Sequence, residues 1–380
     1  MRRPLPDDCR RALARSGLGV VAIAALVHCG ARSELAASGG LADAGHEASN
    51  PADAGVLLDA NGTPDSPGTT TPACRDAVLG TDLLGASGLA VDGSDVYWTT
   101  LDGKLMKSSL DAPGTPLAEG LVSPGGVAVF GDTVFWTEQS RVVSMPKTGG
   151  PMTVVATGQS LPLAVVADAS GVWWLNYGQG ILAGSLVVSR SGGAPEVVVE
   201  QIDTPSDLAM DGTHLYFGAA LAKVGGQIVQ GPLVRVPKAA GAPDLVAKGL
   251  HEPAGLAVDG ARLYWLEQVN DHSSFPGRLR AWQKSGGGPV DLASTADVLT
   301  LRVAVDDRNA YVTGLQGTGT ASHGVLSRVA LAGGPVTELQ RTNGTVYGAV
   351  AVTASAVYWT IGWSKGTQPA GTASVRKTCK

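Results

Sequence analysis

The hydrophobic positions of this chain gather in blocks, and each block is centred on two adjacent large apolar side chains. Seven such pairs occur, and all but one are fully aromatic: Tyr97-Trp98, Phe135-Trp136, Trp173-Trp174, Tyr216-Phe217, Tyr264-Trp265, Tyr311-Val312 and Tyr358-Trp359. The first members of successive pairs lie 38, 38, 43, 48, 47 and 47 residues apart. A period of about 40–50 residues with strand-like composition is typical of the blades of a β-propeller.

Each block predicts four short strands. An apolar stretch followed by Asp-Gly predicts strand a and a tight turn, and the pair itself lies on strand b. A third strand, c, follows at positions such as 104–109, 141–146 or 233–237, and then a Gly/Pro turn and a fourth strand, d, as at 154–157. Small side chains suit strand a, because the innermost strands crowd around the axis. Seven positions before each pair stand Ala90, Ala128, Val166, Ala209, Ala257, Ala304 and Ala351.

The last unit lacks its final turn. Six turns between strands c and d carry a proline: Pro116, Pro151, Pro195, Pro243, Pro289 and Pro335. After the seventh pair the sequence offers a third strand at 373–378, whereas residues 75–80 predict a fourth strand ahead of the first unit. The fold expected is therefore an all-β, seven-bladed propeller of four-stranded antiparallel blades. An N-terminal strand d joins the C-terminal strands a to c, and this closure pairs two otherwise exposed sheet edges.

The same closure brings two cysteines together. In a hairpin of strands c and d the end of c faces the start of d, so Cys379 is expected beside Cys74. A disulfide there closes a loop of about 300 residues, and the chain-entropy model gives it an upper value of about 5 kcal/mol.

The N-terminus predicts export. Five arginines precede an apolar stretch at 17–27, which is too short to span a bilayer and has the length of a signal core. The following Leu26-Val27-His28-Cys29 resembles the lipobox of bacterial lipoproteins. The resemblance implies a signal peptide at 1–28, which includes Cys9, and a lipid-modified Cys29. An ordinary secretory signal is the alternative. Either route leads to an oxidising compartment, which permits the disulfide.

Residues 29–72 predict a flexible tether. Residues 30–72 contain no aromatic side chain and hold one Arg against six Asp and Glu. Such a segment buries too little apolar surface to offset its ordering entropy. A root-mean-square reach of about 35–40 Å would hold the propeller, expected at 73–380, clear of a membrane surface. The expected location is the bacterial envelope, at the outer membrane, with the periplasmic and the surface side both open.

Composition narrows the function classes. Glycines (52) and prolines (22) are abundant and charged residues make up 16%, a profile that suits many short strands with tight turns. The net charge of −5 gives no basic face for nucleic acid. The sequence has no nucleophile elbow, P-loop, dinucleotide fingerprint or H-E-x-x-H motif. No cofactor is expected. The sequence favours a protein that is not an enzyme, but it leaves both alternatives open.

Three of the repeated pairs carry a further resemblance. Tyr97-Trp98-Thr99, Phe135-Trp136-Thr137-Glu138 and Tyr358-Trp359-Thr360 resemble the YWTD repeat of low-density-lipoprotein-receptor-type propellers. The likeness covers the repeat region and departs in blade number, since that family usually has six. NHL-type and related bacterial propellers are similarly distant. The resemblance implies the architecture and a general role in binding, and it transfers no site residue.

The most regular residues are expected to be structural. The aromatic pairs could be stacking platforms for ligands, but regular recurrence favours packing between blades, because a ligand site is usually asymmetric. Five positions before the pair, an aspartate recurs in five units: Asp92, Asp168, Asp211, Asp259 and Asp306. These carboxylates could bind cations around a channel, but capping of the a–b turn is the favoured interpretation.

Asymmetry points to the binding region. The b–c connections are short in the first two units and long in the last four, at 218–231, 267–277, 314–324 and 362–371. They share one face with the d–a connections, and long loops clustered on a rigid scaffold tend to hold binding residues. The candidates are Asn270, Asp271, His272, Phe275, Gln316, His323, Trp363 and Lys365. A metal site formed by His251, His272 and His323 is a weak alternative without the usual ligand spacing.

Two function hypotheses follow. The first is a non-enzymatic envelope lipoprotein whose propeller presents the face of the long loops to a protein, peptide or glycan, with the membrane contacted only through the lipid. The second is a propeller hydrolase or lyase of lactonase-like type with a metal in the central channel. The second class needs several polar residues near the axis, whereas strand a is mostly Ala, Val and Leu. A structural envelope protein without a ligand is a third possibility.

Overall fold

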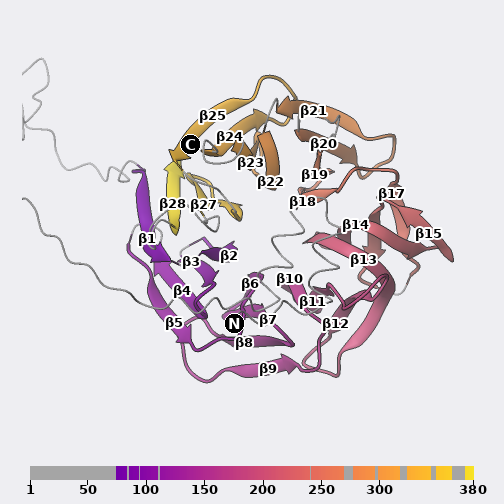
Figure 1. Ribbon diagram of the computed structural model, residues 1–380, viewed down its shortest axis with the longest axis horizontal. Helices are drawn as coiled ribbons and strands as arrows, with labels where there is room; N and C mark the ends of the chain where they lie inside the picture. Colours follow the sequence, from indigo (N-terminus) through magenta and orange to yellow (C-terminus); the bar gives the residue numbers. More distant parts are fainter. Residues whose placement is uncertain are drawn as a thin grey trace, which may run out of the picture.

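The computed structural model describes most of the repeat region as β-strands. The described residues are 74–83, 85–93, 95–109, 112–239, 241–268, 277–295, 298–316, 323–343, 348–361 and 373–380. Figure 1 shows the strands arranged in blades around a closed ring, with strands such as β2, β6, β10, β18 and β22 nearest the centre. No helix in these described ranges is long and apolar enough to cross a membrane.

Four of the blades are separate four-stranded antiparallel sheets, in which neighbouring strands follow chain order. Blade one is β2 (Ala86–Val91), β3 (Asp95–Thr100), β4 (Lys104–Ser109) and β5 (Thr115–Glu119). Blade two is β6 (Val127–Phe130), β7 (Thr133–Glu138), β8 (Arg141–Pro146) and β9 (Thr153–Ala156). Blade five is β18 (Ala254–Val258), β19 (Arg262–Gln268), β20 (Gly277–Gln283) and β21 (Val290–Thr295). Blade six is β22 (Val298–Val305), β23 (Asn309–Gln316), β24 (His323–Ala330) and β25 (Thr337–Asn343).

Blades three and four share one long strand. They comprise β10 (Pro162–Asp168), β11 (Gly171–Asn176), β12 (Gly184–Ser189), β13 (Glu196–Met210), β14 (His214–Val224), β15 (Gln227–Gln230), β16 (Leu233–Pro237) and β17 (Asp244–Ala247). The first half of β13 pairs with β12 as strand d of blade three, and its second half pairs with β14 as strand a of blade four. The sequence predicts two separate strands here, strand d of one blade and strand a of the next. The backbone instead turns within the strand, where Gln201 (φ 60°) and Thr204 (φ 52°) are left-handed.

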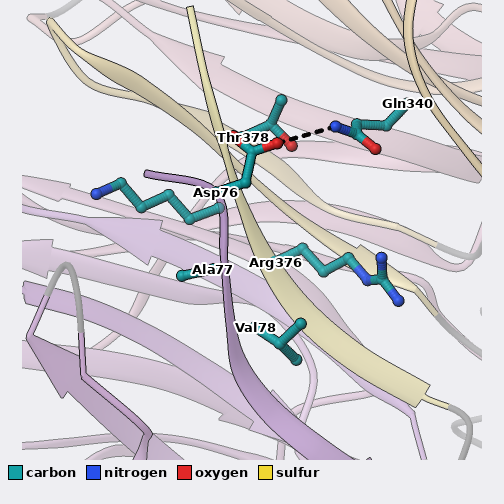
Figure 2. Close-up of a pocket in the computed structure, with 7 residues that line it drawn as sticks. Asp76, Ala77, Val78, Gln340, Arg376 and Thr378 are labelled. Carbon is teal, nitrogen blue, oxygen red and sulfur yellow. Dashed lines mark hydrogen bonds between the residues drawn. The ribbon is translucent and has the colours of Figure 1, made fainter. Parts of the chain in front are cut away.

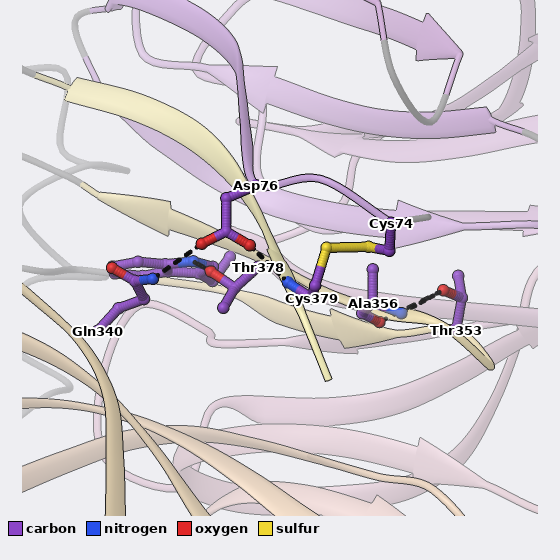
Figure 3. The surroundings of a disulfide bond; sticks show 8 residues. Cys74, Asp76, Gln340, Thr353, Ala356, Thr378 and Cys379 are labelled. Atoms are coloured by element: carbon purple, nitrogen blue, oxygen red, sulfur yellow. Dashed lines mark hydrogen bonds between the residues drawn. A yellow bond between two sulfur atoms is a disulfide. The ribbon is translucent and has the colours of Figure 1, made fainter. Parts of the chain in front are cut away.

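Blade seven closes the ring as predicted. Its order is β26 (Val350–Val352), β27 (Ala356–Ile361), β28 (Ala373–Cys379) and then β1 (Ala77–Leu83). Cys74 and Cys379 form a disulfide with a Cα–Cα distance of 5.8 Å. Figure 3 shows Asp76 beside this bond, where its carboxylate accepts hydrogen bonds from the Cys379 amide (2.8 Å) and the Gln340 side chain (3.1 Å). The predicted seven-bladed fold, its closure and the cysteine pairing are confirmed.

The aromatic pairs pack between blades. All the tryptophans and tyrosines of the pairs are fully buried, whereas Phe135 is half-buried. Successive side chains of a strand point to opposite faces of its sheet. Tyr358 and Trp98 therefore meet in one cluster between blades seven and one, and Tyr264 meets Val312 in another between blades five and six. Seven such clusters join the seven blades, so packing, the favoured interpretation, is confirmed.

Candidate functional site: the loop face

The ring has two faces made by different connections. We call the side of the a–b and c–d turns the turn face, and the side of the b–c and d–a connections the loop face. Every a–b turn spans two or three residues between strand ends. The b–c connections range from the two residues between β7 and β8 to the 11 residues between β27 and β28. Of these two classes of connection, only the b–c connections on the loop face vary widely in length.

On the turn face the recurring aspartates cap their own turns. Asp211 accepts hydrogen bonds from the Thr213 and His214 amides at 2.8 and 2.9 Å and from the Tyr216 hydroxyl at 2.9 Å. Asp259 and Asp306 repeat this arrangement with the tyrosines of their own units. Asp92 and Asp168 each accept one turn amide. Turn capping is therefore confirmed.

The same aspartates also join neighbouring blades. A lysine directly after strand c of the next blade reaches back to the carboxylate, at 2.7 Å for Lys284 and Asp211 and at 2.5 Å for Lys380 and Asp306. We call these contacts inter-blade clips. The other two are Lys147–Asp92 and Lys238–Asp168. The lysines were missed at the sequence level, although their register after strand c is visible once the strands are aligned.

The clips change the acidity of the groups that form them. Burial acts to raise the pKa of Asp306, but hydrogen bonds from Lys380, two amides and Tyr311 outweigh it and lower the pKa to about 2. Burial and the hydrogen bond to Asp306 raise the pKa of Tyr311 to about 12. The pKa of Asp211 is likewise held below its usual range, against the effect of burial, by Lys284 and its turn amides. These carboxylates are ionised and already saturated with donors, which leaves no role in binding a cation.

Two buried glutamates anchor the loop face. Glu138 accepts hydrogen bonds from the Val122 amide and the Trp136 indole at 3.1 Å each, and it pairs with Arg141. Glu267 accepts from the His251 amide at 3.2 Å and pairs with Arg280 at 2.9 Å. Both glutamates occupy the fourth position of the YWTD-like block. The sequence interpretation recognised only Glu138, although Glu267 stands in the same register.

The innermost strands of neighbouring blades approach each other closely. At the position nine before the aromatic pair, a Cβ on Gly88 would lie 2.5 Å from the Gly125 oxygen of the next blade. The position is Gly or Ala in five units and is polar only at Asp207 and Arg302. Asp207 accepts the Leu256 amide at 3.0 Å and lies 4.0 Å from the Arg302 side chain. This carboxylate of blade four therefore contacts both blade five and blade six.

The loop face holds strained backbone close to these inner strands. In three d–a connections and at the bend within β13, a non-glycine residue adopts a left-handed conformation immediately before a proline: Ser123 (φ 47°), Leu161 (φ 55°), Glu252 (φ 46°) and, in β13, Thr204 (φ 52°). A residue before proline normally prefers extended backbone, and such outliers cost about 1–3 kcal/mol each. Strain of this kind tends to gather at functional surfaces. Burial raises the pKa of Glu252.

Most of the predicted binding residues lie outside the described residues. This applies to Asn270, Asp271, His272, Phe275, Trp363 and Lys365, as it does to Cys29 of the predicted lipobox. Two of the predicted residues are described and adjacent, because Gln316 and His323 pair directly across β23 and β24. The Gln316 side chain accepts a hydrogen bond from Arg341 (2.6 Å), and Arg341 also pairs with Glu338. The structure thus joins these two candidates into one polar group at the end of blade six.

The histidine site gains no support from the described part of the chain. His251 is exposed in the connection before blade five, and His323 begins strand c of blade six. His272 lies outside the described residues. Within the described ranges, no group of three or more His, Cys, Asp and Glu is placed to hold a metal ion.

A shallow pocket of about 170 Å³ lies on the outer rim rather than on the loop face. Its lining is drawn in Figure 2 and comes from β25 and the closing strands: Asp76, Ala77, Val78, Gln340, Arg376, Lys377 and Thr378. The dashed bond in that view joins Asp76 to Gln340, which links blade six to blade seven. The polar groups of this pocket therefore belong to the ring closure.

Comparison with solved structures supports the propeller fold. The WD40 β-propeller domain of Doa1 is similar at 11% identity and a TM-score of 0.53, over 80% of this chain and 97% of that chain. YCF48 from Cyanidioschyzon merolae has the same identity and TM-score, over 80% and 98%. A nidogen in complex with laminin shares 19% identity over 55% of this chain and 79% of that chain, with a TM-score of 0.45. No family model and no curated protein matches the chain. The likeness to the two structures with a TM-score of 0.53 establishes the fold, and at 11% identity it assigns no family.

Proposed function

We propose that the chain is an exported, lipid-anchored protein of the bacterial envelope whose propeller binds a protein, peptide or glycan through the loop face. The observation that carries the proposal is the contrast between uniform a–b turns and b–c connections of 2 to 11 residues on the opposite face. A rigid scaffold with variable connections on one side is the usual arrangement of a binding protein.

The loop face offers exposed apolar side chains to such a partner, as the turn face does at Phe130 and Met152. Leu101, Val122 and Ile181 lie in its connections and are 43%, 52% and 55% exposed. Exposed apolar side chains can supply the contacts of an interaction surface. The central-channel enzyme has less support, because the inner-strand carboxylate Asp207 already serves Leu256 and Arg302.

Photo-crosslinking in the intact envelope tests the face. A benzoylphenylalanine replacing Leu101, Val122 or Ile181 should give discrete adducts under illumination. Phe130 and Met152 are matched controls, since they are 43% and 47% exposed but lie on the turn face. Adducts from both faces alike, or from neither, would refute the proposal.

The anchor is tested separately. Cys29→Ser should abolish incorporation of labelled palmitate and release the protein from membranes, whereas Cys9→Ser should change neither. Continued palmitate labelling of the Cys29→Ser protein would overturn the lipobox assignment.

A further inference from the structure

One strand of the described region belongs to no blade. In Figure 1, β15 projects at the outer rim beside β14, and β14 is the strand with which it pairs. The connecting turn is Gly225-Gly226, whose φ angles of 58° and 80° suit a type I′ hairpin. Ala222 and Val224 of β14 are buried in the cluster between blades three and four. The hairpin is therefore anchored to the scaffold on one side.

The outer edge of β15 is open at its centre. In the antiparallel ladder, Val224 and Gln227 flank the turn, and Ala222 pairs with Val229. Residues alternate between bonding inward and outward, so the amide and carbonyl of Ile228 point away from β14. The Gln230 carbonyl confirms this direction, because it accepts the Gly249 amide at 2.8 Å. None of the hydrogen bonds recorded among the described residues uses the outward groups of Ile228.

This edge lacks the features that normally prevent strand pairing. Its sequence is Gln-Ile-Val-Gln, with neither charge nor proline, and Ile228 is 50% exposed. Outer strands elsewhere in the ring carry a charge, such as Asp244 in β17 and Glu338 in β25, apart from the uncharged β9. Charged residues and prolines are the usual protection of an exposed edge.

Two lysines flank the edge, and the nearest acidic side chain of the ladder is Asp203, which pairs with Leu221 on the far side of β14. Lys223 lies directly opposite Ile228 in the ladder and is exposed. Lys248 is exposed next to Gly249, which caps the end of the edge. Residues 219–231 contain no acidic side chain. An extended peptide that enters here would meet the apolar side chain of Ile228 and the exposed lysines Lys223 and Lys248.

We propose that β15 accepts an extended acidic segment of a partner protein as an added β-strand. The Ile228 amide and carbonyl bond the backbone of the segment, its apolar side chains cover Ile228, and its carboxylates pair with Lys223 and Lys248. This inference rests on the proposed binding function and specifies where and how an acidic peptide is recognised. Main-chain bonding with side-chain selection is a known mode of peptide recognition.

The probe is a labelled octapeptide that alternates valine with aspartate, titrated into the full chain by fluorescence anisotropy. Its binding should weaken as salt rises, because exposed charge pairs are screened. A matched peptide with lysine for aspartate should not bind. A third peptide, N-methylated on alternate residues, should bind about tenfold more weakly through lost main-chain hydrogen bonds.

Ile228→Pro is the decisive variant. Position 228 makes no ladder bond to β14, so proline removes the outward donor while the hairpin can persist. Affinity for the valine–aspartate peptide should fall about tenfold. Ile228→Thr keeps the amide and is the matched control, and Lys223→Gln should lower affinity and flatten the salt dependence. A melting temperature equal to that of the wild type in every variant excludes a folding defect. If the proline variant melts at a lower temperature, binding of the N-methylated peptide to the wild-type protein tests the main-chain hydrogen bonds instead.

Three outcomes overturn the inference. The first is equal binding of the methylated and unmethylated peptides. The second is concentration-dependent dimerisation of the wild type that Ile228→Pro removes, which would assign the edge to a second copy. The third is peptide binding that occurs only after deletion of the acidic residues 30–72. If loop-face crosslinks at Leu101 or Ile181 survive in Ile228→Pro, the proposed function stands while this site fails.

Discussion

The turn face and the loop face are made by the same seven repeats, yet they use polar side chains in different ways. On the turn face each recurring aspartate is shared by its turn and, in four of five cases, by a lysine of the next blade. On the loop face the connections vary in length and include left-handed residues before prolines. The turn face is therefore nearly uniform from blade to blade and joins neighbouring blades, whereas the loop face differs from one blade to the next.

The disulfide on the turn face should give the largest effect on stability. Cys74→Ser with Cys379→Ser removes the only covalent closure among the described residues, and the free energy of unfolding should fall by up to about 5 kcal/mol. Denaturant melts of the oxidised protein and the double variant measure the difference. An unchanged midpoint would mean that β1 pairing alone closes the ring.

A single clip should have the second largest effect. Asp211→Ala leaves the buried Tyr216 hydroxyl without its acceptor. It also removes the carboxylate partner of Lys284, whose ammonium keeps only the Asp259 carbonyl as an acceptor. We expect a loss of about 3 kcal/mol, since an unpaired buried group costs its full desolvation. Gln316→Ala on the loop face is the contrasting variant and should cost less than about 0.5 kcal/mol. Similar losses at both sites would remove the distinction between the faces.

The contrast also explains what could be predicted from the sequence. Turn-face features recur in register, so the aligned repeats predicted the aspartate caps, the missing seventh turn and the Cys74–Cys379 pair. A feature that occurs in only one unit cannot be recognised by aligning the repeats. The continuous strand β13 bends at Gln201 and Thr204, which are left-handed although neither residue type favours that conformation. Strand β15 lies in a segment that the sequence predicts to be a loop. The connection at 177–183 was missed because only the last four units were judged long.

Acid should weaken the turn face selectively. The pKa of Asp306 is lowered to about 2 in the folded protein, and an aspartate in an unfolded chain has a pKa of about 3.9. Because the folded value is the lower one, the stabilisation is complete above pH 4 and is lost as pH falls from about 4 towards 2. Thermal melts across this window should show a steeper decline for wild type than for Asp306→Asn. Parallel curves would show that Asp306 does not carry the effect.

The interface between blades five and six offers the smallest and sharpest prediction. Asp259 caps its turn like the others, but the register position after strand c of blade six holds Leu331 in place of a lysine. The Leu331 amide donates to the Arg308 carbonyl, just as the Lys284 amide donates to Ala261. Leu331→Lys should therefore add a clip to Asp259 and raise the free energy of unfolding by about 0.5–1 kcal/mol. Leu331→Gln is the matched control, because it removes the same partly buried apolar contact without adding charge. If the lysine variant is no more stable than the glutamine variant, the clips are a consequence of the fold and contribute little to holding the ring closed.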